Sequence, residues 1–413
     1  VLNTMIQHGL HSEASELVDT ARDKLNQPAF FALQFGSYYS SRMNYGRATG
    51  EYLLYYLHRG QNEDFLVSQL SRFPDESDVQ EQVLPVLNNA LQDNRNDVGL
   101  LKVLADYQYR IQEYDDALEN YRRLEDLENA PGKYRQQVGS DLLNDHEYEK
   151  AIGVYTDLLS QSNVDISRSE LLLGASEARY QKLLQDYEDR SETGLFRQND
   201  FWNTDFVIIP EDAGPTLSDI VEDFKEVTNA FPQTPYSFFA EYRLGEIFLR
   251  LGNDFDQAIT YFGMVADNSQ HPMQQRSLLN IGVSHLAKGD INTARNHWEK
   301  MLTSSAAENP VQHQAQLHKA STYFYSGDLT GGMSELDAML EDLTLTSQEY
   351  NDILEVQTFV RNGLKNGSKA DTSALKEFFR GEFFLKQHKI SEAQRTFLHV
   401  PELQQTDVLA PYA

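Results

Sequence analysis

The sequence contains no cysteine in its 413 residues and few basic residues. Without thiols it has no disulfide, no cysteine-ligated zinc or iron–sulfur centre and no thiol nucleophile. Only 35 Lys and Arg stand against 63 Asp and Glu, a formal net charge of −28. Nucleic acids and anionic lipid surfaces are bound by basic patches, so the sequence argues against both as partners.

Long apolar stretches are also missing. Apolar runs extend over only a few residues, as in Phe206-Val207-Ile208-Ile209, whereas a membrane-spanning helix needs about 20. The sequence therefore predicts no transmembrane span.

Aromatic residues make up 11% of the chain, which argues against global disorder. They supply a large core, in one elongated unit or in two to three compact units.

A helical repeat organises the chain. One pattern recurs in register: an alanine, an aromatic residue four positions later, and an apolar residue three positions after that. We call this alanine the anchor. The anchors Ala14 and Ala48 are 34 residues apart, and so are Ala117 and Ala151. The clear cases are Ala48-Tyr52-Tyr55, Ala117-Tyr121-Leu124 and Ala151-Tyr155-Leu158. We expect the aromatic residue to fill the groove between neighbouring helical hairpins.

A small residue precedes each anchor by about twelve positions. In the first half it is Gly36, Ser71, Ala105 or Gly139; in the second half the small residue and its anchor are Gly245 and Ala258, Gly282 and Ala294, Ala320 and Gly332, and Gly381 and Ala393. Small residues at both places let the two helices of a hairpin approach closely.

This period and slot pattern resembles the tetratricopeptide repeat family over most of the chain. The resemblance implies an all-α fold, a right-handed α-solenoid of about nine to ten hairpins. The segment Ala230-Phe231-Pro232-Gln233-Thr234-Pro235-Tyr236, followed by Ala240, Tyr242, Leu244 and Gly245, is similar to tetratricopeptide proteins of the bacterial cell envelope. That narrower resemblance implies a periplasmic, cell-surface or extracellular location and leaves a cytoplasmic one open.

Two irregularities interrupt the repeat. Residues 186–219 separate the two helices of one hairpin and are rich in acidic and aromatic residues. They form either a hook that packs on the chain's own solenoid or an arm that binds a partner or another copy. The candidate contact residues there are Phe196, Phe201, Trp202, Phe206 and Ile208. Between Leu343 and Thr372, the apolar spacing predicts one extra, unpaired helix.

These features divide the chain into a first repeat block at 1–185, the insertion at 186–219, a second block at 220–343, and the extra helix with a last hairpin at 344–413. Counting back from Ala14 places the first small slot at Leu2. We therefore expect the native protein to continue upstream or to be completed there by a partner.

Catalytic and metal signatures are absent from the sequence. It has no Gly-rich phosphate loop, no His-Glu-x-x-His and no Gly-x-Ser-x-Gly motif, and its eleven histidines are dispersed. The acidic insertion lacks the regular calcium-binding loop. We expect no enzymatic activity, no cofactor and no metal.

The first helix of each hairpin lines the concave face of such a solenoid. A carboxylate clamp for an acidic tail would need Lys, Arg and Asn there, but the sequence offers a mixed aromatic and hydroxyl-bearing surface that suits an extended peptide, a partner helix or a glycan. The candidate partner-binding residues on this face are Lys102, Arg110, Tyr242, Arg250 and Tyr325.

The sequence thus favours a non-catalytic scaffold that holds a protein or peptide partner, in the setting of a bacterial envelope assembly. The alternative is a structural subunit that assembles head to tail into an oligomer or filament. An enzyme or sugar-binding module on a helical superhelix is a third class, for which no convergent acid–base set is present.

The acidic surface has two interpretations. It serves solubility alone, or it reflects either a saline habitat or an obligate basic partner. If the chain is salt-adapted, its melting temperature should rise clearly between about 0.05 M and about 1 M salt, because screening relieves self-repulsion. A nearly constant melting temperature would leave solubility as the explanation.

Overall fold

The computed structural model describes most of the chain. The described residues are 4–5, 8, 10–60, 62–162, 164, 166–188, 199–203, 207, 214–268, 271–304, 310–344, 347–364 and 368–403. They form twenty helices and no strand, which confirms the all-α solenoid. The chain divides into two compact units, Val1–Ser167 and Arg168–Ala413. This boundary precedes the expected one at 185 and places the whole helix before the insertion in the second unit.

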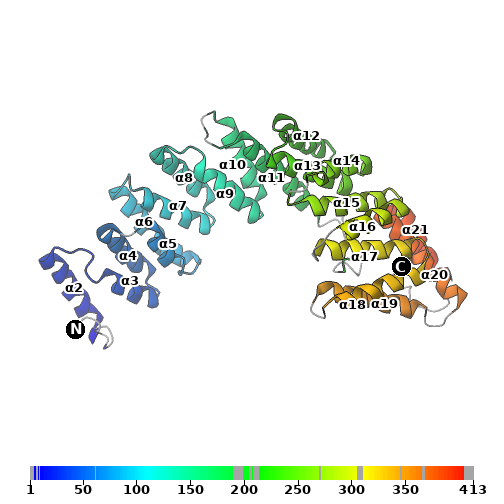
Figure 1. The fold of residues 1–413 in the computed structure, drawn as a ribbon. Coiled ribbons are helices and arrows are strands. Elements are labelled where there is room, and N and C mark those ends of the chain that lie inside the picture. The colour runs from blue at the N-terminus through cyan, green and yellow to red at the C-terminus, as the bar shows by residue number, and fades with distance from the viewer. Residues whose placement is uncertain are drawn as a thin grey trace. The chain divides into compact units, whose positions relative to one another are not determined.

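The first unit is a succession of helices in which near neighbours pack together, α3 on α4, α7 on α8 and α9 on α10 (Figure 1). Its helices are α2 (His11–Leu25), α3 (Ala32–Ser41), α4 (Tyr45–Arg59), α5 (Glu63–Leu70), α6 (Ser77–Asp93), α7 (Val98–Arg110), α8 (Tyr114–Glu128), α9 (Lys133–Asn144) and α10 (Tyr148–Ser160).

The second unit continues this pattern through the paired helices α11 to α18 and ends in the pair α20 and α21. Its helices are α11 (Arg168–Glu188), α12 (Gly214–Ala230), α13 (Pro235–Arg250), α14 (Phe255–Ala266), α15 (Gln274–Ala287), α16 (Ile291–Ser304), α17 (Pro310–Tyr325), α18 (Leu329–Asp342), α19 (Gln348–Gly363), α20 (Lys369–Lys386) and α21 (Ile390–Leu403). The insertion separates α11 from α12, and α19 is the predicted extra helix.

A ring lying over a glycine closes the hairpins. A Cβ atom added at Gly245 of α13 would stand 2.7 Å from the Phe262 ring of α14, and one at Gly282 of α15 would stand 2.2 Å from Nε1 of Trp298 in α16. These rings were expected to fill the groove between neighbouring hairpins, and the structure shows that they also pack within a hairpin. Each ring occupies the space that the absent glycine side chain leaves within its own hairpin.

The α17–α18 hairpin exchanges these two roles. Its small residue is Gly332 in the second helix, and the ring comes from Phe324 in the first, 2.5 Å from where a Gly332 Cβ would lie. The close approach therefore depends on one glycine facing one ring, whichever helix supplies each. Because the same contact recurs, successive first helices keep equivalent faces directed to the same side.

Local signals fix where α13 and α20 begin. The Thr234 side chain accepts a hydrogen bond from the Ser237 amide, and Pro235 occupies the first turn of α13. Ser368 and Asp371 form the same reciprocal capping box at the start of α20.

Two glycine substitutions in adjacent helices test the packing rule. Gly245→Ala should lower the free energy of unfolding by about 1–3 kcal/mol, because the new methyl group overlaps the Phe262 ring. Gly263→Ala in α14 meets no atom within 4 Å and should raise it by about 0.5–1 kcal/mol through helix propensity. Denaturant unfolding measures both, and equal effects would refute the ring-over-glycine contact.

Candidate partner-binding groove

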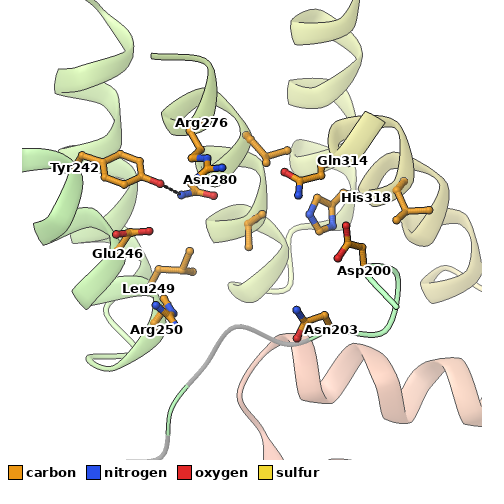
Figure 2. A pocket seen from close by; sticks show the side chains of 13 residues that line it. Asp200, Asn203, Tyr242, Glu246, Leu249, Arg250, Arg276, Asn280, Gln314 and His318 are labelled. Atoms are coloured by element: carbon orange, nitrogen blue, oxygen red, sulfur yellow. Dashed lines mark hydrogen bonds between the residues drawn. The ribbon is translucent and has the colours of Figure 1, made fainter. Parts of the chain in front are cut away.

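Three first helices of the second unit, α13, α15 and α17, surround a cavity of about 320 Å³, and part of the insertion lies at its margin (Figure 2). The surrounding residues are Asp200, Asn203, Tyr242, Glu246, Leu249, Arg250, Arg276, Leu279, Asn280, Val283, Gln314, Leu317 and His318.

Polar side chains reach the cavity because they are spaced by one helical turn. Arg276 and Asn280 are four residues apart on α15, and Gln314 and His318 are four apart on α17, a spacing that places each pair on one helix face. The Asn280 amide donates to the Tyr242 hydroxyl over 3.5 Å, which connects α15 to α13. The three helices thus present polar side chains interspersed with Leu249, Leu279, Val283 and Leu317.

Glu246, an acidic residue of the cavity wall, is paired with Arg243 of the same helix. The half-buried Arg243 guanidinium donates to Glu177 at 2.6 and 2.8 Å and also to Glu246, and it lies 4.8 Å from the centre of the Tyr180 ring. Burial alone would lower the pKa of Arg243, but the two carboxylates outweigh it and raise that pKa. Burial, with the nearby Glu246 charge, raises the pKa of the Tyr242 hydroxyl.

The basic side of the cavity comprises Arg250 and Arg276. Arg276 is exposed at the rim, and within the described residues no hydrogen bond or ion pair reaches its guanidinium. His318 stacks on Trp298 with ring centroids 5.3 Å apart, which fixes the imidazole plane at the wall. The cavity therefore offers planar amides, an imidazole and an available guanidinium.

The insertion residues that the structure describes pack on the chain's own core. Phe201 and Trp202 are 2% and 6% exposed and lie among the aromatic residues of α17, α19 and α20. The Val207 amide donates to the Arg250 carbonyl at 3.1 Å, at the end of α13. Of the two interpretations of the insertion, these contacts fit the hook. The other candidates there, Phe196, Phe206 and Ile208, lie outside the described residues.

The sequence candidates of the second unit's first helices lie in two environments. Tyr242 and Arg250 line the cavity. Tyr325 is buried instead and stacks on Phe383 of α20 at 5.5 Å, which corrects its expected place on an open surface. The cause is the packing of α20 on α17.

The two candidates of the first unit both lie on α7, where neighbouring groups of the same chain hold them. The Lys102 ammonium is 3.2 Å from the Asp106 carboxylate. The Arg110 guanidinium donates to the Leu70 carbonyl at 2.8 Å and lies 3.1 Å from Asp75. Arg110 and Asp106 border a cavity of about 50 Å³ between α5 and α7, too small for a peptide segment.

Of the residues around the cavity, only Tyr242 and Arg250 were sequence candidates; the polar residues of α15 and α17 that the sequence analysis missed are Arg276, Asn280, Gln314 and His318. They occupy the positions six and two residues before the small slot of their helices, at Gly282 and Ala320. The sequence candidates Tyr242 and Arg250 lie three residues before and five residues after the slot Gly245, so a count at those positions does not reach these four residues.

Within the described residues, no group of three or more histidine or acidic side chains is placed to hold a metal ion. Of the helices that the structure describes, none combines the length and the apolar character needed to cross a bilayer.

Residues 239–269, in α13, α14 and the turn after them, match the family model for the tetratricopeptide repeat, and the predicted resemblance to this repeat is confirmed. No curated protein matches the sequence.

Several solved structures resemble the fold at low identity. PilW, a widely conserved type IV pilus biogenesis factor, is 13% identical over 68% of this chain and 97% of its own, with a TM-score of 0.37. A tetratricopeptide repeat protein from Parabacteroides merdae is 13% identical over 72% of this chain and 98% of its own, with a TM-score of 0.36. The human IFIT1 dimer with PPP-AAAA is 12% identical over 98% of this chain and 89% of its own, with a TM-score of 0.38.

Likeness at these TM-scores does not show what this chain binds. The absence of nucleic acid among its partners therefore remains a prediction from its charge.

We expect the buried carboxyl of Glu382 in α20 to make the stability of the second unit depend on pH. Burial raises the pKa of its carboxyl to about 7 from 4.5, although the Lys386 ammonium opposes the shift; Tyr325 of α17 faces the same carboxyl. The unfolded chain releases this proton at lower pH than the folded chain does. The free energy of unfolding should therefore fall by about 3 kcal/mol as pH rises from 4.5 to about 7, and the loss persists above that pH.

Glu382→Gln should remove this dependence, so the variant should be more stable than the wild type at pH 8 and similar to it near pH 4.5. Glu392→Gln, an exposed site on α21, makes the same charge change and should leave the profile unaltered. Thermal melts across this pH range measure the difference, and parallel profiles for Glu382→Gln and the wild type would contradict the assignment.

Proposed function

We propose that this protein, built from tetratricopeptide-type repeats, is a non-catalytic scaffold that holds an extended segment of a protein partner in the groove over α13, α15 and α17. The observation that carries this function is the convergence of polar side chains from three successive first helices on one cavity of about 320 Å³. A cavity of this size accommodates one or two side chains of a peptide that continues along the surface.

The chemistry of the groove suits a peptide main chain. The amides of Asn280 and Gln314 each carry a donor and an acceptor, as each peptide unit does. They lie on adjacent first helices, so an extended segment that crosses from α15 to α17 can satisfy both. The Arg276 guanidinium adds two parallel donors that fit a carboxylate of the partner.

The setting we propose is an assembly of the bacterial cell envelope, with the chain in the periplasm or at the cell surface. Its support is the sequence of residues 230–245, whose Phe-Pro-Gln-Thr-Pro-Tyr segment leads into α13. The strongly negative net charge favours a protein partner over a nucleic acid, because a polyanion would be repelled.

Head-to-tail self-assembly is the second candidate function. The observation that favours it is a set of exposed leucines on the first described long helix, with Leu10 at the start of α2 and Leu17 and Leu25 within it, 45%, 43% and 53% exposed. Exposed apolar residues on a repeat helix suit contact with another copy.

A charge reversal in the groove tests the scaffold function. A photo-reactive residue at Gln314 should link the protein to a polypeptide partner in extracts of its source, and the additional change Arg276→Glu should reduce that capture at least tenfold. The expected loss corresponds to about 1.4 kcal/mol or more of binding free energy. Quantitative mass spectrometry of the linked products measures it.

Two controls accompany this test. Arg395→Glu makes the same charge change at an exposed site of α21 and should leave the capture unchanged. A photo-reactive residue at Glu299 on α16 should give no partner. Equal capture from Glu299 and Gln314, or links to nucleic acid in place of protein, would overturn the proposed function.

A further inference from the structure

The α3–α4 hairpin lies in the part of the chain where acidic residues are scarce. Between Leu25 and Asn62 the sequence has one acidic residue, Glu51, whereas the whole chain has 63. The Glu51 carboxylate is occupied, because it accepts hydrogen bonds from both terminal nitrogens of Arg22. Three arginines stand against this one acid, so the hairpin is net positive within a chain whose formal net charge is −28.

Two of these arginines lie over tyrosine rings. The Arg42 guanidinium is 5.8 Å from the centre of the Tyr38 ring, and the Arg47 guanidinium is 5.6 Å from the centre of the Tyr39 ring. The two rings contact each other with centroids 5.4 Å apart. Within the described residues, neither guanidinium is paired with a carboxylate. The four side chains form one line, here named the arginine–tyrosine row, with a guanidinium at each end.

The hairpin core holds this row at the surface. Phe35, which is 2% exposed, contacts both tyrosine rings at 6.3 and 5.7 Å between centroids and packs in one cluster with residues of α2. Arg42 and Arg47 are exposed, and Met43 in the turn between the helices is 73% exposed. Tyrosine, arginine and methionine are enriched at protein–protein interfaces, and tyrosine and arginine carry much of the binding energy there.

The position of Arg47 favours a bound anion. It lies in the first turn of α4, which contains no acidic residue, and the guanidinium and the positive end of the helix both attract negative charge. The amides of this turn already donate to the side chains of Asn44 and Gln82. A ligand therefore meets the side chains of the row and not free main-chain donors.

We propose that the arginine–tyrosine row is a second docking surface, which binds an acidic segment of a partner protein. A guanidinium that lies over a ring still has its N–H edge free to bind a carboxylate through two parallel hydrogen bonds. The steps along the row measure 5.4 to 5.8 Å. An extended segment of about five residues, at about 3.3 Å per residue, therefore reaches from one guanidinium to the other.

Charge selects this occupant. A nucleic acid is a long polyanion and is repelled by the acidic remainder of the chain, whereas a short acidic segment needs only the hairpin. None of the four residues of the row lines the cavity over α13, α15 and α17. The second docking surface is therefore independent of the partner-binding groove, and its test can fail without affecting the proposed function.

Binding of an acidic peptide tests the row. The probe is a capped fluorescent peptide, Glu-Glu-Leu-Glu-Glu, and fluorescence anisotropy at about 0.1 M salt measures its affinity. It should bind the wild type, and Arg42→Gln/Arg47→Gln should weaken it at least tenfold. The uncharged peptide Gln-Gln-Leu-Gln-Gln should bind neither protein. Failure of the acidic peptide to bind the wild type would overturn the proposal.

Two further variants separate the row from charge in general. Arg95→Gln/Arg395→Gln removes the same charge from two other exposed sites and should leave the affinity unchanged. Arg42→Lys/Arg47→Lys keeps the charge but loses the planar pair of donors, and should weaken binding about threefold. Equal losses from the two glutamine pairs, or no loss from the lysine pair, would contradict the assignment.

Cross-linking identifies the source of the carboxylates. A photo-reactive residue at Met43, in extracts of the native source, should link to peptides of another protein in which Asp and Glu outnumber Lys and Arg. Arg42→Gln/Arg47→Gln should remove these links. Links to peptides without that acidic excess, to nucleic acid or only to other copies of this chain would overturn the assigned occupant, as would the absence of links.

Discussion

The close approach of paired helices, set by a glycine of one helix under an aromatic ring of the other, is the constraint on which the second unit depends. Gly245 under Phe262 and Gly282 under Trp298 leave no room for a Cβ atom. With the hairpins closed in this way, the first helices α13, α15 and α17 present equivalent faces side by side. The groove forms along these faces, because the polar residues of α15 and of α17 that line it are spaced by one helical turn.

The two departures from the repeat form one structure. The insertion contributes residues 199–203, the extra helix α19 accepts their hydrogen bonds, and α20 supplies the ring on which Trp202 stacks. The same five residues place Asp200 and Asn203 at the margin of the groove. Asp200 and Asn203 therefore belong both to the segment held by α19 and α20 and to the margin of the cavity.

The repeat was predictable because its signal is local. A small residue, an anchor and a ring at fixed spacing define each hairpin. Counting three before and five after Gly245 gave Tyr242 and Arg250, whereas Arg276, Asn280, Gln314 and His318 lie six and two residues before Gly282 and Ala320, outside that count. The positions of Trp202 and Tyr325 were not predictable in this way. Their burial depends on α20 packing against α17, and no periodicity near either residue reports a contact with a helix so distant in sequence.

The most direct measurement for the partner-binding groove is cross-linking mass spectrometry on the unmodified protein within its native assembly. We predict links to another polypeptide that concentrate on α13, α15 and α17 around the cavity, with few on the second helices α14, α16 and α18. Links to other proteins that avoid the three first helices, or that join only the chain's own α2 to α21, would contradict the groove as the partner-binding surface.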